Sequence, residues 1–294
     1  MYLFTRHSLT DSWMLFDLPQ LEASLAGAIY AGKLHFAPVT ESTNTDALAA
    51  ARAGAPHGSV YFADEQLAGR GRGDHAWHSV SGEGLYVSVL LRPDLPAARL
   101  PLLPLAAGLA AANAIAATTS LTVDLRWPND LLIASRKVGG ILVESRTSSE
   151  GLPHAVVVGI GINVHQRAFA VDLATPATSL DLESGVPSDA QGAPTSSLGW
   201  QSGTSNPRQP LLVALLKSLQ REALGLLDPT SIESIPRRVQ AASTWVRGRS
   251  VHVHGPQACT GVTAGLDENG FLLVETETGL VTVQTGGLRA ANEG

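Results

Sequence analysis

The residue types best suited to chemistry are concentrated in one glycine- and arginine-rich stretch, residues 65–77. Glycines at positions 69, 71 and 73 let the backbone approach a ligand closely, because they lack a side chain. Arg70 and Arg72 add guanidinium groups, which bind phosphate or carboxylate through two parallel hydrogen bonds, and Trp77 adds a flat apolar surface for a ring. The stretch therefore favours a ligand with a ring and an anionic group, although a solvated loop without a ligand would have the same composition.

Two further polar clusters lie where a helix or a strand is expected to begin or end. Residues 40–46 combine hydroxyl, amide and acidic side chains just before an alanine-rich segment. They either cap that helix or hydrogen-bond a polar ring at its N-terminus. Asn129 and Asp130 follow Pro128, which fixes a turn and so places both side chains at a strand end, where sites commonly form.

Lys137 and Asn163 are each open to two interpretations. Lys137 precedes the glycine pair Gly139 and Gly140 in an expected hairpin return, where it is either a solvated turn lysine or a cation beside a ligand. Asn163 is the only polar side chain in residues 156–164, so its amide must find partners in the core backbone or in a ligand. The Gly-Ile-Gly of this stretch lacks a third glycine and a following helix, which excludes a dinucleotide-binding fingerprint.

The elements that must position these residues are helices and strands in mixed order. Apolar residues at helical spacing predict helices at 17–32, 46–53, 98–119, 210–227 and 229–241. Strand composition predicts strands at 34–36, 60–63, 85–91, 123–125, 137–144 and 156–164. From Thr244 onward the pattern changes to short strands, which predicts a small β-barrel with strands at 249–254, 259–266, 271–275 and 280–284.

Bulk composition limits the class of protein. The 294 residues exceed one typical domain, so a main domain and a smaller one are expected. A formal net charge of -6 argues against a general binder of nucleic acid or of anionic membranes. Cys259 is the only cysteine, which excludes an internal disulfide and a cysteine-rich zinc site and fits a reducing cytoplasm.

Several segments are expected to take no part in the site. Residues 1–17 lack the apolar core of a signal peptide, and the apolar tract 100–117 is better explained as a buried helix than as a membrane span. The segment before Ser42 is too short for a winged helix-turn-helix, so no DNA-reading domain is expected. Residues 183–209 are rich in Ser, Gly, Pro and Gln, which predicts a flexible insert.

Five motifs, taken in order along the chain, resemble those of the biotin protein ligases. They are Glu41-Ser42-Thr43-Asn44, Gln66-x-Ala68-Gly69-Arg70-Gly71-Arg72 with Trp77, Trp127-Pro128-Asn129-Asp130, Lys137-x-Gly139-Gly140-Ile141-Leu142-Val143-Glu144, and Gly159-Ile160-Gly161-Ile162-Asn163-Val164. The resemblance is strong over residues 39–180 and weak over residues 246–288. It implies an α+β fold in which residues 1–243 form a mixed sheet flanked by helices, like that of class II synthetases, and residues 244–294 form a small SH3-like barrel.

The resemblance also implies an activity. Biotin protein ligases join biotin and ATP to give biotinyl-5′-adenylate and pyrophosphate, and then transfer biotin to one lysine of the biotin carboxyl carrier domain of a biotin-dependent carboxylase. ATP and Mg²⁺ are the implied cofactors, with biotin as the substrate. The chain resembles the enzyme-only subtype without an N-terminal DNA-binding domain, a cytoplasmic monomer or weak homodimer that binds neither DNA nor a membrane.

Roles of individual residues follow from the matching positions. Hydroxyl and amide side chains would bind the ureido ring of biotin, and glycine backbone amides would hold its valerate end. The residues expected to bind biotin are Ser42, Thr43, Asn44, Gln66, Gly69, Arg70, Trp77, Gly139 and Gly140. The residues expected to bind the nucleotide are Arg70, Arg72, Trp77, Asn129, Lys137 and Asn163, the last at the adenine edge.

Catalysis is expected to depend on fixed positive charge. Lys137 is the first expected catalytic residue and Arg72 the second, because a cation at the α-phosphate stabilises the charge that builds up there. Asp130, together with Asn129, offers oxygen ligands for Mg²⁺.

The sequence departs from the family pattern at two positions. His75 stands where the family usually has Arg, which predicts weaker or pH-dependent nucleotide binding, because a histidine is only partly charged at neutral pH. Arg126 stands where the family usually has Lys and keeps the charge. Two alternatives stay open, a lipoate protein ligase and a non-catalytic module that senses biotin or its adenylate. The presence of both Lys137 and Arg72 disfavours the sensing module, since binding alone does not require a cation at the reacting phosphate.

Overall fold

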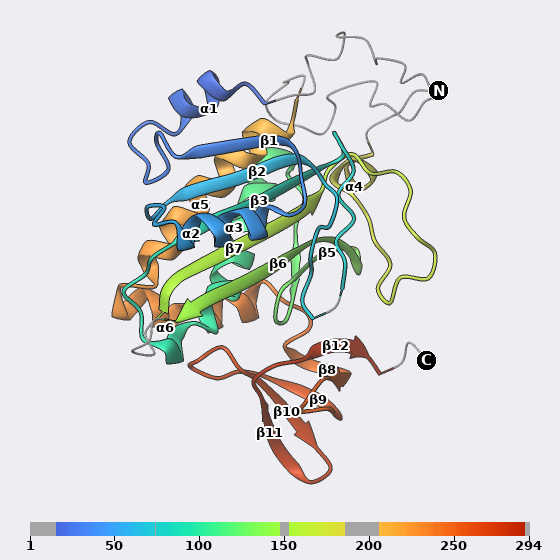
Figure 1. The fold of residues 1–294 in the computed structure, drawn as a ribbon. Helices are drawn as coiled ribbons and strands as arrows, with labels where there is room; N and C mark the ends of the chain where they lie inside the picture. Colours follow the sequence, from blue (N-terminus) through green and yellow to red (C-terminus); the bar gives the residue numbers. More distant parts are fainter. Residues whose placement is uncertain (1–15, 74, 148–152, 186–205, 292–294) are drawn as a thin grey trace.

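The computed structural model describes residues 16–73, 75–147, 153–185 and 206–291. A seven-stranded sheet with helices on both faces forms the larger part, and a separate five-stranded sheet follows it near the C-terminus (Figure 1). This arrangement confirms the mixed sheet flanked by helices that the sequence predicted.

The larger sheet has the strand order β1-β2-β3-β7-β6-β5-β4. Its first two strands pair in parallel, and every other neighbouring pair is antiparallel. The strands are β1 (Leu34–Thr40), β2 (Ser59–Gln66), β3 (Gly84–Leu91), β4 (Asp124–Arg126), β5 (Asp130–Ile133), β6 (Arg136–Thr147) and β7 (Pro153–Asn163). The apolar strand β7 lies at the centre of this order. A strand buried on both faces has no exposed side for polar residues, which explains its apolar sequence.

The helices divide between the two faces of the sheet. They are α1 (Leu18–Ser24), α2 (Thr43–Arg52), α3 (Leu102–Thr119), α4 (Leu180–Ser184), α5 (Arg208–Gly225) and α6 (Pro229–Ala241). Side chains alternate along a strand, so Val158 and Ile160 of β7 join the large buried cluster that includes α3 and α5, whereas Val157 packs with Ala47 and Ala51 of α2. The site described below lies on the α2 face.

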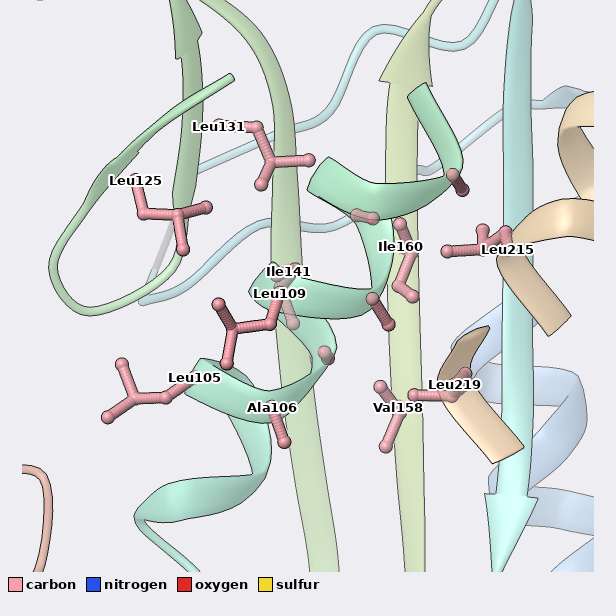
Figure 2. Packing of buried hydrophobic residues seen from close by; sticks show 14 of the residues in the cluster. Leu105, Ala106, Leu109, Leu125, Leu131, Ile141, Val158, Ile160, Leu215 and Leu219 are labelled. Carbon is pink, nitrogen blue, oxygen red and sulfur yellow. The ribbon is translucent and has the colours of Figure 1, made fainter. Parts of the chain in front are cut away.

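α3 is the helix on which the larger core is built. Figure 2 shows Leu105 and Leu109 of α3 in the same cluster as Ile141 of the sheet and Leu215 of α5. By length and composition α3 could cross a membrane, but 72% of its apolar window is buried inside the protein. Such burial is typical of a core helix, as expected for the apolar tract 100–117.

The smaller sheet has the strand order β11-β10-β9-β8-β12 and is antiparallel throughout. Its strands are β8 (Arg247–His254), β9 (Cys259–Leu266), β10 (Leu272–Thr276), β11 (Gly279–Val283) and β12 (Gly287–Ala290). This sheet is consistent with the expected SH3-like domain and contains one short strand, β12, outside the predicted ranges. The boundary expected between residues 243 and 244 stays a prediction.

Hydrogen bonds join the two sheets at several points. Trp127 Nε1 donates to the carbonyl of Gly270 over 3.0 Å. The backbone N–H of Thr244 donates to the Asp124 carboxylate over 2.8 Å. These contacts fix the smaller sheet beside the end of the larger sheet that carries β4.

The structure corrects three predicted boundaries. Helix 17–32 is wrong in its extent, because α1 ends at Ser24 and Gly27 has a φ of 80°, which a helix does not contain. The helix predicted at 46–53 begins earlier, at Thr43, so part of the polar cluster forms its first turn. The insert predicted at 183–209 overlaps the end of α4 and the beginning of α5. Its middle, residues 186–205, lies outside the described residues.

Burial of α5 generates a stability prediction. Leu215 is fully buried and Leu224, on the same helix, is 54% exposed. Leu215→Ala is expected to lower the free energy of unfolding by about 2 to 5 kcal/mol, because it leaves a cavity in the core. Leu224→Ala, the matched control, is expected to change it by less than about 0.5 kcal/mol. Urea unfolding followed by circular dichroism measures both, and equal losses would show that α5 does not anchor the core as described.

Candidate active site

The glycine- and arginine-rich stretch connects β2 to β3 and folds back over the sheet as an irregular hairpin. Isolated bridges join Gln66 to Ser79 and Arg70 to Ala76. Within these bridges the backbone N–H of Trp77 donates to the carbonyl of Gly69 over 2.8 Å. An added Cβ on Gly69 would lie 2.4 Å from the Trp77 carbonyl oxygen, so only glycine allows the two arms to come this close.

Trp77 is seated directly against the backbone of β6 and β7. An added Cβ would lie 2.6 Å from its indole ring at Gly161 and 3.4 Å from it at Gly140. The indole Nε1 is buried and has no hydrogen-bond partner among the described residues. Buried polar groups normally have partners, so this unpaired N–H is an exception among the described residues.

A network of polar side chains lies at the N-terminus of α2. The Gln66 carbonyl oxygen accepts from the backbone N–H of Thr43 over 2.9 Å, and the Gln66 amide donates to Ser79 Oγ over 2.7 Å. Thr43 Oγ1 lies 2.7 Å from Ser88 Oγ, which in turn donates to Asn44 Oδ1 over 2.5 Å.

The expected helix cap before α2 can be compared with this network. Ser42 occupies the N-cap position, but its side chain makes no capping hydrogen bond. Ser42, Thr43 and Asn44 are all buried at the α2 face of the sheet. The Ser42 side chain therefore does not cap the helix in this structure, and binding of a polar ring by the cluster stays a prediction.

Glu144 of β6 connects the network to the hairpin. Its carboxylate accepts from the Asn44 amide over 2.8 Å and from the Arg70 guanidinium over 2.6 Å. An added Cβ on Gly159 would lie 2.0 Å from Asn44 Oδ1, so glycine is required beneath the amide. Arg70 is consequently held toward α2.

A second charged cluster centres on Asp130. Lys137 Nζ lies 2.6 Å from one of its carboxylate oxygens, and the Arg126 guanidinium lies 2.7 Å from the other. Burial alone would raise the pKa of Asp130, but the charges and hydrogen bonds of these two cations hold the pKa below its usual value. One carboxylate thus faces two cations, and the excess positive charge suits an anion.

Arg72 reaches the smaller sheet. Its guanidinium donates to the carbonyl of Gly286 over 2.8 Å and to Thr285 Oγ1 over 3.0 Å. Burial lowers the pKa of Arg72, and the negative charge of Asp130 acts in the opposite direction. The guanidinium therefore lies within the electrostatic reach of the Asp130 cluster.

The remaining predicted residues lie in or beside the sheet. Asn129 donates to the carbonyl of Ile141 over 2.8 Å, and Asn163 donates to the carbonyl of Thr178 over 2.9 Å. The Asn163 amide group thus has a backbone partner, and its role at adenine stays a prediction. Gly139 and Gly140 pair with both β5 and β7 inside the sheet, and their role toward biotin stays a prediction.

No group of three or more His, Cys, Asp or Glu side chains gathers within the described parts of the chain in a way that could hold a metal ion. Both oxygens of Asp130 already face cations. These residues alone therefore do not fit a bound Mg²⁺, and the metal role predicted for Asp130 stays a prediction through which we derive no step.

Comparison with known proteins identifies the family. The model of the biotin/lipoate A/B protein ligase family matches residues 36–163. The biotin--[acetyl-CoA-carboxylase] ligase of Mycobacterium tuberculosis is 32% identical over 252 residues, which cover 84% of this chain and 85% of that protein. The chain belongs to the biotin protein ligase family.

Further relatives of this ligase agree with that assignment. The bifunctional ligase/repressor BirA of Bacillus spizizenii is 33% identical over 251 residues, covering 84% of this chain and 70% of that protein. The biotin protein ligase of Aquifex aeolicus, solved in complex with biotin and ATP, superposes with a TM-score of 0.71 at 28% identity, covering 88% of this chain and all of that one.

Sequence reasoning missed several residues that contact the predicted site residues of this ligase. Ser88 is a small hydroxyl residue in the otherwise apolar and aromatic buried strand β3, a signal that could have found it. Glu144 lay inside a motif but was given no role. Thr285 and Gly286 have no signal, because only the docking of the smaller sheet brings them to Arg72.

The seat of Trp77 generates a second prediction. Gly161→Ala is expected to lower the free energy of unfolding of the ligase by about 1 to 3 kcal/mol, because the added methyl group overlaps the indole. In a Trp77→Ala background the same change is expected to cost almost nothing, since the overlap is gone. Urea unfolding of the four proteins tests this coupling, with Gly225→Ala on α5 as a control at ordinary contact distance. An equal loss of unfolding free energy in both backgrounds would contradict the packing of Trp77 against Gly161.

Proposed function

We propose that this ligase activates biotin with ATP and transfers it to a lysine of a carrier domain. In the first step a carboxylate oxygen of biotin attacks the α-phosphorus of ATP, and the bond to pyrophosphate breaks. In the second step the lysine amine attacks the acyl carbon of biotinyl-5′-adenylate, AMP leaves, and an amide forms. Family membership supports this reaction, and the site residues support how it is carried out.

The observation that carries the proposal is the order of chemistries along the sheet. Gly159 and Gly161 lie on the same face of β7, about 7 Å apart at two residues' rise. Asn44 and the polar network stand over the first glycine, and Trp77 stands over the second. Gly140 beside it faces both Trp77 and Lys137. A polar surface, an apolar surface and a cationic surface therefore follow one another, as a ligand with a ureido ring, an aliphatic chain and a carboxylate requires.

Lys137 is proposed as the catalytic cation. Its ion pair with Asp130 holds Nζ in place before the substrate arrives, so little reorganisation is required when charge builds up at the α-phosphate. Nζ also lies 5.6 Å from the centroid of the Trp77 ring. We propose that the carboxylate of biotin meets ATP beside this ring.

The Gly/Arg hairpin is proposed to retain the adenylate. Biotinyl-5′-adenylate is a mixed anhydride that reacts with water and with any nearby unprotonated amine, so a specific ligase must cover it. The hairpin carries Arg70 and Arg72, whose guanidinium groups bind carboxylate and phosphate. His75 is exposed on its turn, where it cannot replace the two parallel hydrogen bonds of an arginine.

We propose the biotin carboxyl carrier domain of a biotin-dependent carboxylase as the protein substrate, because close relatives carry the name biotin--[acetyl-CoA-carboxylase] ligase. The net charge of -6 supports an enzyme that binds neither DNA nor a membrane. A cytoplasmic monomer or weak homodimer is our proposal for its working state.

Mass spectrometry of the acceptor tests the proposed reaction. The protein, ATP and a purified biotin carrier domain are incubated with biotin or, separately, with lipoate. We expect the mass of one biotinyl group on the carrier domain and no lipoyl addition. Lipoyl addition alone would favour a lipoate ligase, and tight biotin binding without any addition would favour a sensing module.

The role of Lys137 gives a third prediction. Lys137→Ala is expected to slow single-turnover formation of the adenylate by about 100- to 1,000-fold, because one preorganised charge at the transition state is lost. Lys217→Ala, at an exposed position of α5, is the matched control and should react like the wild type. A Lys137→Ala rate within tenfold of wild type, in a protein with unchanged circular dichroism, would remove Lys137 from the mechanism.

A further inference from the structure

The smaller sheet contributes two acceptors to the Gly/Arg hairpin. The guanidinium of Arg72 donates from Nη1 to the Gly286 carbonyl over 2.8 Å and from Nη2 to Thr285 Oγ1 over 3.0 Å. Both acceptors belong to the turn between β11 and β12, more than two hundred residues away along the chain. The two sheets therefore meet across the side chain that we propose to hold the adenylate phosphate.

The turn that supplies these acceptors is built to be stiff. Gln257 Oε1 accepts from the backbone N–H groups of Gln284 and Thr285 over 2.7 and 3.4 Å, and its Nε2 donates to the Thr282 carbonyl over 3.1 Å. Gly286 has a φ of 153°, and an added Cβ would lie 2.5 Å from the His254 carbonyl oxygen. The acceptors are thus in place before Arg72 binds them, which lowers the entropic cost of the contact.

The contact leaves the guanidinium able to bind a ligand as well. An arginine carries five N–H groups in a planar fork, and the turn takes one from each of two nitrogens. The remaining N–H groups are available to an anion, and the charge of Asp130 is felt at Arg72. Because the turn holds one edge of the Arg72 guanidinium, the opposite edge keeps a fixed orientation toward the phosphate.

Other hydrogen bonds besides this contact join the two parts of the protein. Trp127 donates to Gly270, and Thr244 donates to Asp124 of β4. Arg72, by contrast, sits in a hairpin next to Gly71 and Gly73, which supply no side-chain packing. The contact therefore constrains the hairpin more than it constrains the domain.

We infer that the turn formed by Gln284, Thr285 and Gly286 positions Arg72 over the adenylate, so that the C-terminal domain takes part in retaining the intermediate. This inference rests on the proposed function. Thr285 and Gly286 act through the arginine and are positioning residues. When the contact is absent, the hairpin opens more often, and water attacks the acyl carbon of the released anhydride to give biotin and AMP.

Thr285→Val tests the inference, because valine has the shape of threonine and lacks the hydroxyl acceptor. Release of biotinyl-5′-adenylate from the purified complex is expected to be about three- to tenfold faster, the usual effect of one exposed hydrogen bond. Thr282→Val, on the exposed side of β11, is the matched control and should release it at the wild-type rate. A wild-type release rate in Thr285→Val would overturn the inference.

A double-mutant cycle separates positioning from a general loss of packing. In an Arg72→Gly background, Thr285→Val is expected to have no further effect on release, because its partner is already absent. If the effects of the two single changes on the release rate multiply in the double variant, Thr285 acts independently of Arg72, and the inference is wrong.

A readout without substrates separates this inference from the proposed function. In the ligand-free protein, subtilisin cleavage within residues 69–75 is expected to be about three- to tenfold faster in Thr285→Val than in Thr282→Val, because the hairpin has lost an anchor. This result holds whether or not the protein makes an adenylate. Equal cleavage rates would refute the anchor even if the ligase reaction proceeds, and unequal rates without any adenylate would refute only the proposed function.

Discussion

The seating of one indole ring against two strands is the constraint on which the site depends. Trp77 can pack this closely against β7 only because a glycine occupies position 161, and it also contacts β6 at Gly140. Its position brings the arms of the hairpin over the sheet, and with them Arg70 and Arg72. The glycines lower the intrinsic stability of a strand, and here the loss is offset by burial of a large aromatic surface. The glycine-rich central strand is therefore a seat for the indole ring as well as a core element.

Near this indole ring, two cations balance the charge of a buried carboxylate. Asp130 is a largely buried carboxylate, and its ion pairs with Arg126 and Lys137 explain why it remains ionised. Arg126 also lies 5.0 Å from the centroid of the Trp245 ring, which Arg249 approaches from 3.7 Å. The arginine at position 126, where the family usually has lysine, thus links the charged cluster to the beginning of the C-terminal domain through its planar group.

Sequence patterns predicted most of the fold, because long apolar stretches such as α3 and β7 have few alternative structures. They predicted the Gly/Arg hairpin and the polar cluster before α2, since glycine, arginine and helix-capping residues leave local signals. They failed where structure depends on distant contacts. The end of α1 was placed too late, and nothing in the types of Thr285 or Gly286 indicates that they bind Arg72. Ser88 had a signal, a small hydroxyl side chain in an apolar strand, but its partners come from α2.

The bonds between the two sheets limit how such a ligase can be recombined. Trp127 with Gly270, Asp124 with Thr244, and Arg72 with the turn at 285 each pair a residue in or beside the larger sheet with one in a turn or segment beside the smaller sheet. A C-terminal barrel taken from a relative would need a matching carbonyl, hydroxyl and turn at the same three points. An exchange of the smaller sheet between relatives therefore has to preserve all three contacts, wherever along the sequence the two parts are joined.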